Sequence, residues 1–224
     1  MEEKLAFLDE HYLSHFDYLD VDSVIQEQKA FGACQDVTLE YPVAENEGEE
    51  DNTYLSYNMV VGNAADSQMA MAFEVLDYAL LSAPGAPLKQ ALLDVKAGKD
   101  VYGSYDDGIL QPYFTVIAKG SNPDRKEEFV SVIRQVLGDI VKNGIDRKAV
   151  EAGINYFEFR YREADFSSYP KGLMYSLDIL GDWLYEKGNP FAQVQQLTVF
   201  EKLKKAVNAG YFEELIRKYL LENP

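Results

Sequence analysis

The chain has 224 residues, of which 47% are hydrophobic and 16 are tyrosine, and its formal net charge is −17. This length predicts one large domain, or two small ones sharing a core, that folds without disulfide or metal support. The acidic balance argues against a nucleic-acid binder, which needs a basic face, and is typical of a soluble protein; attraction of cationic peptides is the alternative.

The N-terminal part predicts one helix and two strands. Apolar residues near helical spacing predict a helix over residues 2–18, and residues 19–36 are expected to be irregular. Alternation of apolar and polar side chains predicts strands at Val37–Val43 and Thr53–Val61. The acidic run Glu45–Asp51 between them is predicted to be a solvated loop, because it lacks the fixed oxygen register of a calcium loop.

The next part predicts two helices and a hairpin. Asp66 or Ser67 can cap the first helix, and prolines with a glycine at residues 84–87 separate it from the second. Asp100–Tyr105 and Gln111–Ala118 flank an Asp-Asp-Gly turn, which predicts a β-hairpin. The first helix carries its apolar stripe at Met69, Phe73, Leu76 and Leu80.

The remainder of the chain predicts helices with defined ends. Asn122, followed by Pro123, predicts a helix start, and Gly144 predicts its end. Asp146 predicts the cap of the following helix. Further helices are predicted at residues 170–185, 191–207 and 211–221.

This order of elements predicts the α+β class, with one antiparallel sheet and helices on one face. We expect residues 1–36 to be a linker helix and an irregular lead-in, and residues 37–165 to be the α+β core. Residues 166–224 are expected to form a helical part packed on that core, within a single domain overall. A seam is expected near Ala164–Pro170.

Cys34 is the single cysteine, so a disulfide within the chain is excluded and a reducing compartment is favoured. It has no histidine nearby in sequence to act as a base, and a structural thiol is therefore expected rather than a nucleophile. No apolar run reaches the ~18 residues of a membrane helix, and the first residues do not open a signal peptide. We therefore predict a cytoplasmic, soluble protein with no membrane partner.

His11 and His15 have the i, i+4 spacing of a zinc-binding pair on a helix. The inverted H-x-x-E-H motif requires a glutamate at the fourth position to deprotonate the zinc-bound water, and this position is Ser14. These are the two histidines of the chain, so a third ligand would have to be a carboxylate or Cys34. We therefore predict a surface or interface helix here, and no metal or cofactor in this chain.

A dense group of charges at Arg160, Arg162, Glu163 and Asp165 follows a predicted long helix. Ion pairs that fix the turn after this helix are one interpretation, and a rim that contacts a peptide is the other. A loop that begins a helix is then predicted at Tyr169-Pro170-Lys171-Gly172. A phosphate-binding loop is not expected here, because it would require a glycine-rich run before Lys171 and none is present.

The chain resembles the pitrilysin/insulinase family of zinc metallopeptidases, and within it the presequence-protease branch that includes falcilysin. The likeness spans nearly all 224 residues, and none of its stretches is a catalytic motif. The matching stretches are Asp9–Phe16, Thr53–Gly62, Leu76–Leu93, Asp100–Phe114, Asn143–Asn155 and Arg160–Leu173.

The resemblance implies the second, non-catalytic domain in the N-terminal half of a peptidase built from four related α+β domains. Such a domain forms part of a chamber wall, while the first domain holds the zinc and the enzyme cuts unfolded peptides. The expected partners are other domains of the parent polypeptide and unfolded peptides, with no nucleic acid. Residues expected at the chamber or at a domain contact are Gln111, Arg162, Glu163, Asp165, Tyr169 and Lys171.

Two alternatives remain open at the level of sequence. One is a stand-alone, non-catalytic scaffold or peptide-binding subunit of a processing-peptidase-like assembly. The other is an independent enzyme that uses His11 and His15. The resemblance implies a further strand beyond Glu222-Asn223-Pro224, which, with the linker-like opening at Met1, favours an excised fragment over the stand-alone subunit; bound equimolar zinc would support the independent enzyme.

Overall fold

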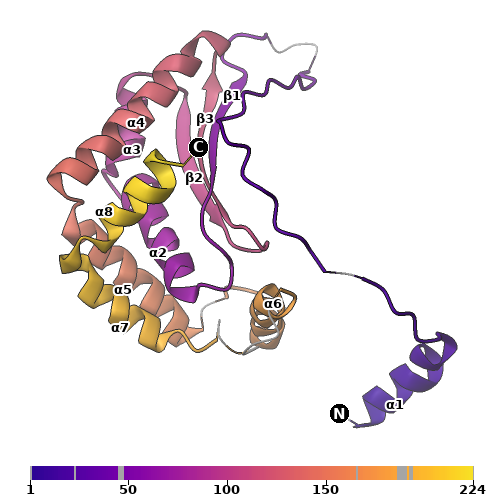
Figure 1. Ribbon diagram of the computed structural model, residues 1–224. Helices are drawn as coiled ribbons and strands as arrows, with labels where there is room; N and C mark the ends of the chain where they lie inside the picture. The colour runs from indigo at the N-terminus through magenta and orange to yellow at the C-terminus, as the bar shows by residue number, and fades with distance from the viewer. Residues whose placement is uncertain are drawn as a thin grey trace.

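The computed structural model describes residues 2–22, 24–44, 48–164, 166–185, 191 and 194–223. In this part of the chain a three-stranded antiparallel sheet carries helices on one face, which confirms the α+β class (Figure 1). The strands are β1 (Thr53–Val60), β2 (Asp100–Asp106) and β3 (Tyr113–Ser121). Their order in space is β1-β3-β2, so the β2–β3 hairpin is extended by β1 on the far side of β3.

The helices keep the predicted chain order. Asp66 accepts a hydrogen bond from the backbone N–H of Met69 and caps α2, while Asp146 accepts from Lys148 and Ala149 and caps α5. Gly144 ends α4 with a φ of 93°, a conformation that favours glycine. The α-helices are α1 (Glu2–His11), α2 (Ser67–Asp77), α3 (Pro87–Asp94), α4 (Lys126–Asn143), α5 (Arg147–Glu163), α6 (Lys171–Trp183), α7 (Leu197–Ala206) and α8 (Tyr211–Leu215).

Short helical segments of other types continue or precede these helices. Two π-helical segments, Tyr78–Ser82 and Ile216–Leu221, continue α2 and α8. Three 3₁₀ segments occur at Leu13–His15, Pro123–Arg125 and Val207–Ala209.

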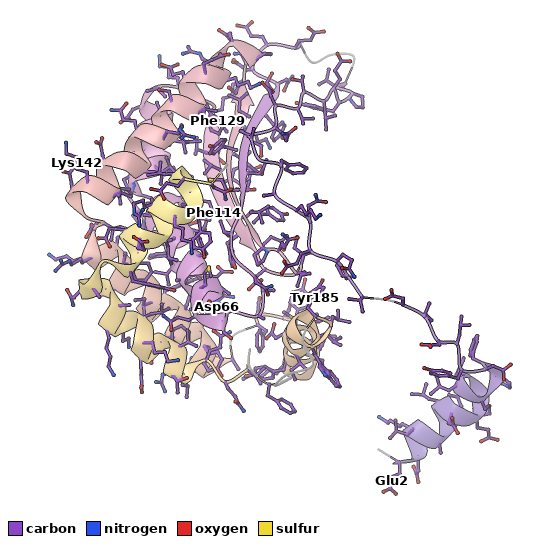
Figure 2. All side chains as sticks on the ribbon, in the orientation of Figure 1. Glu2, Asp66, Phe114, Phe129, Lys142 and Tyr185 are labelled. Carbon is purple, nitrogen blue, oxygen red and sulfur yellow. The ribbon has the colours of Figure 1, made fainter. Side chains whose placement is uncertain are left out.

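The core lies between the sheet and the helices. On the face of the sheet that the helices cover, Met59 of β1 and Val101 of β2 are buried between exposed neighbours, whereas in the central strand β3 Thr115 is buried as well as Phe114 and Val116. Phe73 of α2 packs against Phe114, with ring centroids 6.2 Å apart. Figure 2 shows Phe114 between the strands and the helices. The predicted strand alternation therefore selects the residues that form the core.

The N-terminal arm, residues 2–44, differs from the prediction. The helix predicted over residues 2–18 ends at His11, because Tyr12 has a φ of −134° that no α-helix accommodates. Val37–Val43 is not a strand: it runs extended without ladder hydrogen bonds, and Val37 and Leu39 are 71% and 84% exposed. Alternation alone does not form a strand where no partner strand satisfies the backbone.

Two helix starts also differ from the prediction. The side chain of Asn122 does not cap a helix; its amide exchanges hydrogen bonds with Asp51, at 2.8 and 2.9 Å. Pro123 therefore begins the 3₁₀ turn, and α4 begins three residues later. The helix predicted from residue 191 begins at Leu197 in the described part of the chain.

Candidate functional site

The sheet has an open face, opposite the face covered by the helices. Side chains that alternate with the core residues point to this face, and the strand register places them in four rows across the sheet. The rows, in the order β1-β3-β2, are Tyr54–Lys119–Asp100, Ser56–Ile117–Tyr102, Asn58–Thr115–Ser104 and Val60–Tyr113–Asp106. The two inner rows thus hold uncharged polar groups together with Ile117 and Tyr102, and the charged groups lie in the two end rows.

A hydrogen-bonded group occupies the middle of the open face. Thr115 Oγ1 donates to Asn58 Oδ1 at 2.5 Å, and Ser56 Oγ donates to the same oxygen at 3.0 Å. The amide oxygen of Asn58 is therefore used, and its N–H groups have no acceptor among the described residues. They are positioned to donate to a carbonyl oxygen of a ligand.

The end rows carry the charged side chains and two tyrosines, Tyr54 and Tyr113. Lys119 lies over the ring of Tyr54, 5.8 Å from its centroid. At the opposite end, the hydroxyl of Tyr113 donates to Asp106 at 3.1 Å. This hydrogen bond and the negative charge of Asp106 raise the pKa of Tyr113. Flat apolar rings and fixed polar groups at both ends suit contact with an extended chain rather than with one small molecule.

Both outer strands of the described sheet have a free edge. β1 and β2 each pair with β3 on one side, so the N–H and C=O groups on the other side of each lie outside the sheet ladder, and of these the carbonyl of Val60 accepts from the amide of Asn223 at 2.7 Å. An extended peptide can add to such an edge through main-chain hydrogen bonds. The arrangement can therefore hold peptide backbone.

A pair of half-buried carboxylates, Glu74 and Asp77, lies on the covered side of the sheet. Burial raises the pKa of Glu74 to about 7, and the charges of Asp107 and Asp77 act in the same direction, whereas Arg160 lowers it. Burial also raises the pKa of Asp77, whose Oδ2 accepts a hydrogen bond from Ser82 at 3.0 Å. Asp77 Oδ1 is buried without a hydrogen-bond partner among the described residues. These groups affect stability and do not face the open side.

The residues predicted at the chamber or a domain contact fall at two places. Gln111 lies at the end of the hairpin, where its amide donates to the carbonyl of Gln28 at 3.0 Å and accepts from its N–H at 2.7 Å. Lys171 donates to the carbonyl of Glu163 at 3.3 Å, which joins the end of α5 to the start of α6. The chamber role of these residues stays a prediction.

Arg162 and Tyr169 lie near the same α5–α6 turn. Arg162 pairs with Glu158 at 2.7 Å, and Lys204 of α7 pairs with the same carboxylate, so this group links two helices. Tyr169 is 62% exposed. Asp165 lies outside the described residues. These ion pairs favour the interpretation that Arg162 fixes the turn after the helix over the interpretation that it contacts a peptide.

The polar groups of the open face were not predicted from the sequence. In the sequence they occupy the strand positions between the core residues: Ser56 and Asn58 alternate with the apolar residues of β1. The alternation that predicts the core positions of a strand therefore also predicts which of its residues lie on the open face. The strand register that places Asn58 beside Thr115, however, is visible only in the fold.

The described residues do not fit a zinc site. The break at Tyr12 removes His11 and His15 from a common helical face, because α1 ends at His11 and His15 lies in a separate 3₁₀ turn. Within the described ranges no group of three or more His, Cys, Asp or Glu side chains could hold a metal ion. Nor does any helix there combine the length and apolar character needed to cross a bilayer.

The fold and this one-sided sheet agree with the comparisons with known proteins. Residues 3–157 match the family model described as the peptidase M16 inactive domain. The chain therefore belongs to the M16 inactive-domain family, whose members include domains of zinc proteases and presequence proteases.

Known relatives of this chain are much longer polypeptides. Protein HypA of Clostridium perfringens is 41% identical over 222 residues, which are 99% of this chain and 23% of that protein. Presequence protease 1 of Arabidopsis thaliana, chloroplastic/mitochondrial, is 28% identical over 90% of this chain and 19% of its own length. The chain thus spans about a fifth of the length of these relatives.

Two solved structures share the fold. A protease from Helicobacter pylori matches 98% of this chain and 49% of its own, with a TM-score of 0.58 and 15% identity. The inactive peptidase domain of a proposed zinc protease from Bordetella parapertussis matches 75% of this chain and 85% of its own, with a TM-score of 0.56 and 13% identity. At this identity the likeness concerns the fold.

Proposed function

We propose that this chain is the second, non-catalytic domain in the N-terminal half of a zinc-dependent endopeptidase that degrades unfolded peptides. Its open sheet face forms part of the wall of the chamber that holds the peptide. The observation that carries this proposal is the one-sided sheet in a chain of the M16 inactive-domain family. Zinc and the catalytic base belong to another domain of the parent polypeptide.

The chemistry of the open face supports a wall that contacts peptide backbone. The amide of Asn58 and the hydroxyl of Ser104 offer hydrogen bonds that do not depend on the side chains of a substrate. Tyr102 adds an exposed aromatic surface beside them. Such contacts select extended chains over folded proteins, and the net charge of −17 favours cationic ones.

The first test separates the domain from its parent. The 224-residue chain and the full-length polypeptide encoded by the same reading frame are assayed for bound zinc and for cleavage of an unstructured peptide. We expect equimolar zinc and chelator-sensitive cleavage in the longer protein, and neither in the chain alone. Zinc-dependent cleavage by the purified chain, or a reading frame that encodes no H-x-x-E-H domain, would refute the proposal. The second result would favour the stand-alone peptide-binding subunit.

The second test concerns the open face in the full-length enzyme. Tyr102→Ala removes a ring from the open face, and we expect KM for an unfolded peptide to rise about fivefold with kcat unchanged, as for a contact made equally in ground and transition states. Lys142→Ala is the matched control, because Lys142 points outward from α4 (Figure 2). Equal effects of the two substitutions would remove the open face from the substrate path.

A further inference from the structure

The N-terminal arm holds most of the exposed apolar surface of the molecule. Sixteen of the thirty exposed large apolar side chains among the described residues lie in residues 2–44, and none of the described residues of the arm is buried. Figure 1 shows α1 at the end of an extended segment, apart from the sheet and its helices. Apolar surface gathered in this way marks an interaction site.

Helix α1 lacks the packing that a helix of its length needs. It has ten residues, and isolated helices below ~12–15 residues are marginal in water. Tyr12, which is 55% exposed, follows the end of the helix, and Leu5 and Leu8 share one side of the helix at i and i+3 and are 58% and 46% exposed. This side is the apolar stripe of a helix that packs on a surface, and the described chain does not supply that surface.

The arm is part of the family unit and not an unrelated tail. The match to the inactive-domain model begins at residue 3, and the alignment to protein HypA includes 222 residues of this chain. This chain covers 23% of that relative. The segment that forms the arm is thus aligned with a protein in which most of the polypeptide lies outside the matched region.

The second half of the arm is held by the hairpin loop, the start of α4 and β1, which leaves the first half to reach outward. Gln28 exchanges two hydrogen bonds with Gln111, Asp36 pairs with Lys126, and the ring of Tyr41 lies 5.9 Å from that of Tyr54. These contacts begin after residue 26 and follow the course of the arm beside β1. Residues 2–25 are therefore the part positioned to dock elsewhere.

The charge of the arm indicates the chemistry of its partner. Residues 2–44 contain ten Asp and Glu side chains against Lys4 and Lys29. A second copy of this chain carries the same acidic arm on a body of net charge −17, so pairing between copies is opposed by repulsion. A partner with basic groups around an apolar groove is complementary in both respects.

We propose that residues 2–25, led by the Leu5–Leu8 side of α1, dock in an apolar groove with a lysine- and arginine-rich rim on another domain of the parent polypeptide. This inference rests on the proposed function, since it requires the larger protein. The arm then fixes the orientation of the two domains, and Gln111 in the hairpin loop and Lys126 at the start of α4 act as its anchoring residues.

Hydrogen exchange at α1 tests the proposal in the 224-residue chain and in the full-length protein from the same reading frame. We expect the amides of α1 to exchange at least about tenfold more slowly in the full-length protein. Leu8→Asp in the full-length protein should return them to the rate of the short chain. Ala6→Asp adds the same charge about 100° around the helix from Leu5, and it should leave the protection in place.

The outcomes separate this inference from the proposed function. Equal exchange at α1 in both proteins overturns the docking, even where the full-length protein binds zinc and cleaves peptide. Equal effects of Leu8→Asp and Ala6→Asp also overturn it, because no face is then selected. Protection in the short chain that rises with concentration, together with a dimeric mass by light scattering, would overturn it and assign the arm to a second copy. A zinc-free, inactive full-length protein with a protected arm would refute the proposed function and keep the docking.

Discussion

Gly103 sets how closely α2 approaches the sheet, and its replacement gives a graded test of the packing. It lies in β2 opposite Val116, on the face that the helices cover. A Cβ atom at this position would overlap Leu81 Cδ1 and lie 2.7 Å from Asp77 Oδ1 and 2.8 Å from the backbone oxygen of Thr115. One of these atoms is main chain of the neighbouring strand, so a rotamer change alone does not relieve the contact.

The magnitude follows from two opposing effects of Gly103→Ala. Overpacking of this kind costs about 1–3 kcal/mol, and the lower entropy of the unfolded chain returns about 0.4–1 kcal/mol. We expect a net loss of about 1–2 kcal/mol in the free energy of unfolding. In a chain of this size that loss lowers Tm by about 3–6 °C.

Two other glycines complete the series. A Cβ atom added at Gly138 in α4 would meet no heavy atom within 4 Å, so Gly138→Ala should raise stability by about 0.5–1 kcal/mol through helix propensity. A Cβ atom at Gly153 in α5 would lie 3.0 Å from Tyr78 Cδ1 and 3.3 Å from Val75 Cγ1, so Gly153→Ala should fall between the two. Urea unfolding monitored by circular dichroism measures all three. The reasoning fails if Gly103→Ala is as stable as the unchanged chain, or if Gly103→Ala and Gly138→Ala shift stability in the same direction.

Three further changes are expected to have measurable effects. The pKa of Glu74 is raised from 4.5 to about 7, so the ionised carboxylate destabilises the fold progressively as pH rises from 4.5 to 7, by about 3 kcal/mol in total. Glu74→Gln should remove this dependence of the unfolding free energy on pH and should stabilise the chain at pH 8. An unchanged pH dependence in urea unfolding would contradict the assignment. Asp146→Ala removes the cap of α5 and should cost about 1 kcal/mol in the same assay, whereas no loss would mean that water replaces the cap. Phe114→Ala opens the core beside Phe73 and should cost about 3–5 kcal/mol, and a loss below about 1 kcal/mol would show that the site collapses.

Local signals predicted most of the elements that form the core. Asp66 and Asp146 are caps because a short side-chain oxygen before an apolar stripe satisfies free backbone N–H groups, and this needs no knowledge of distant residues. The hairpin around residues 107–112 follows in the same way from its turn sequence. Such signals act within a few residues, and the fold reproduces them.

Predictions that depended on distant partners failed. The side chain of Asn122 has a choice between the N–H groups of the next helix and Asp51, which lies 71 residues away in sequence, and the fold selects Asp51. Val37–Val43 has the alternation of a strand, yet alternation does not reveal whether a neighbouring strand will pair with it. The open face depends on both kinds of information. The alternating polar residues of β1 are visible in the sequence, but the rows across the sheet depend on the register between β1 and β3.

The burial of Glu74 was also beyond reach of the sequence. A charged residue within an amphipathic helix normally faces solvent, and Glu74 stands next to Phe73 of the apolar stripe. Besides Asp77 of its own helix, the charges that act on its pKa come from Asp107 in the hairpin loop and Arg160 near the end of α5. These segments are 33 and 86 residues away in sequence (107 − 74 and 160 − 74), so no local pattern reports them.

The open sheet face and the exposed arm are two consequences of one property. An antiparallel sheet with a single covered face is stable when its other face is polar, and the rows around Asn58 and Thr115 meet this condition. The arm does not have such a polar surface, because Leu5, Leu8 and Tyr12 are apolar and exposed. A polar open face can contact water or a passing peptide, whereas an apolar helix side requires a permanent cover. The two surfaces therefore differ in kind: the sheet face suits reversible contact with substrate, and the arm suits a fixed contact between domains.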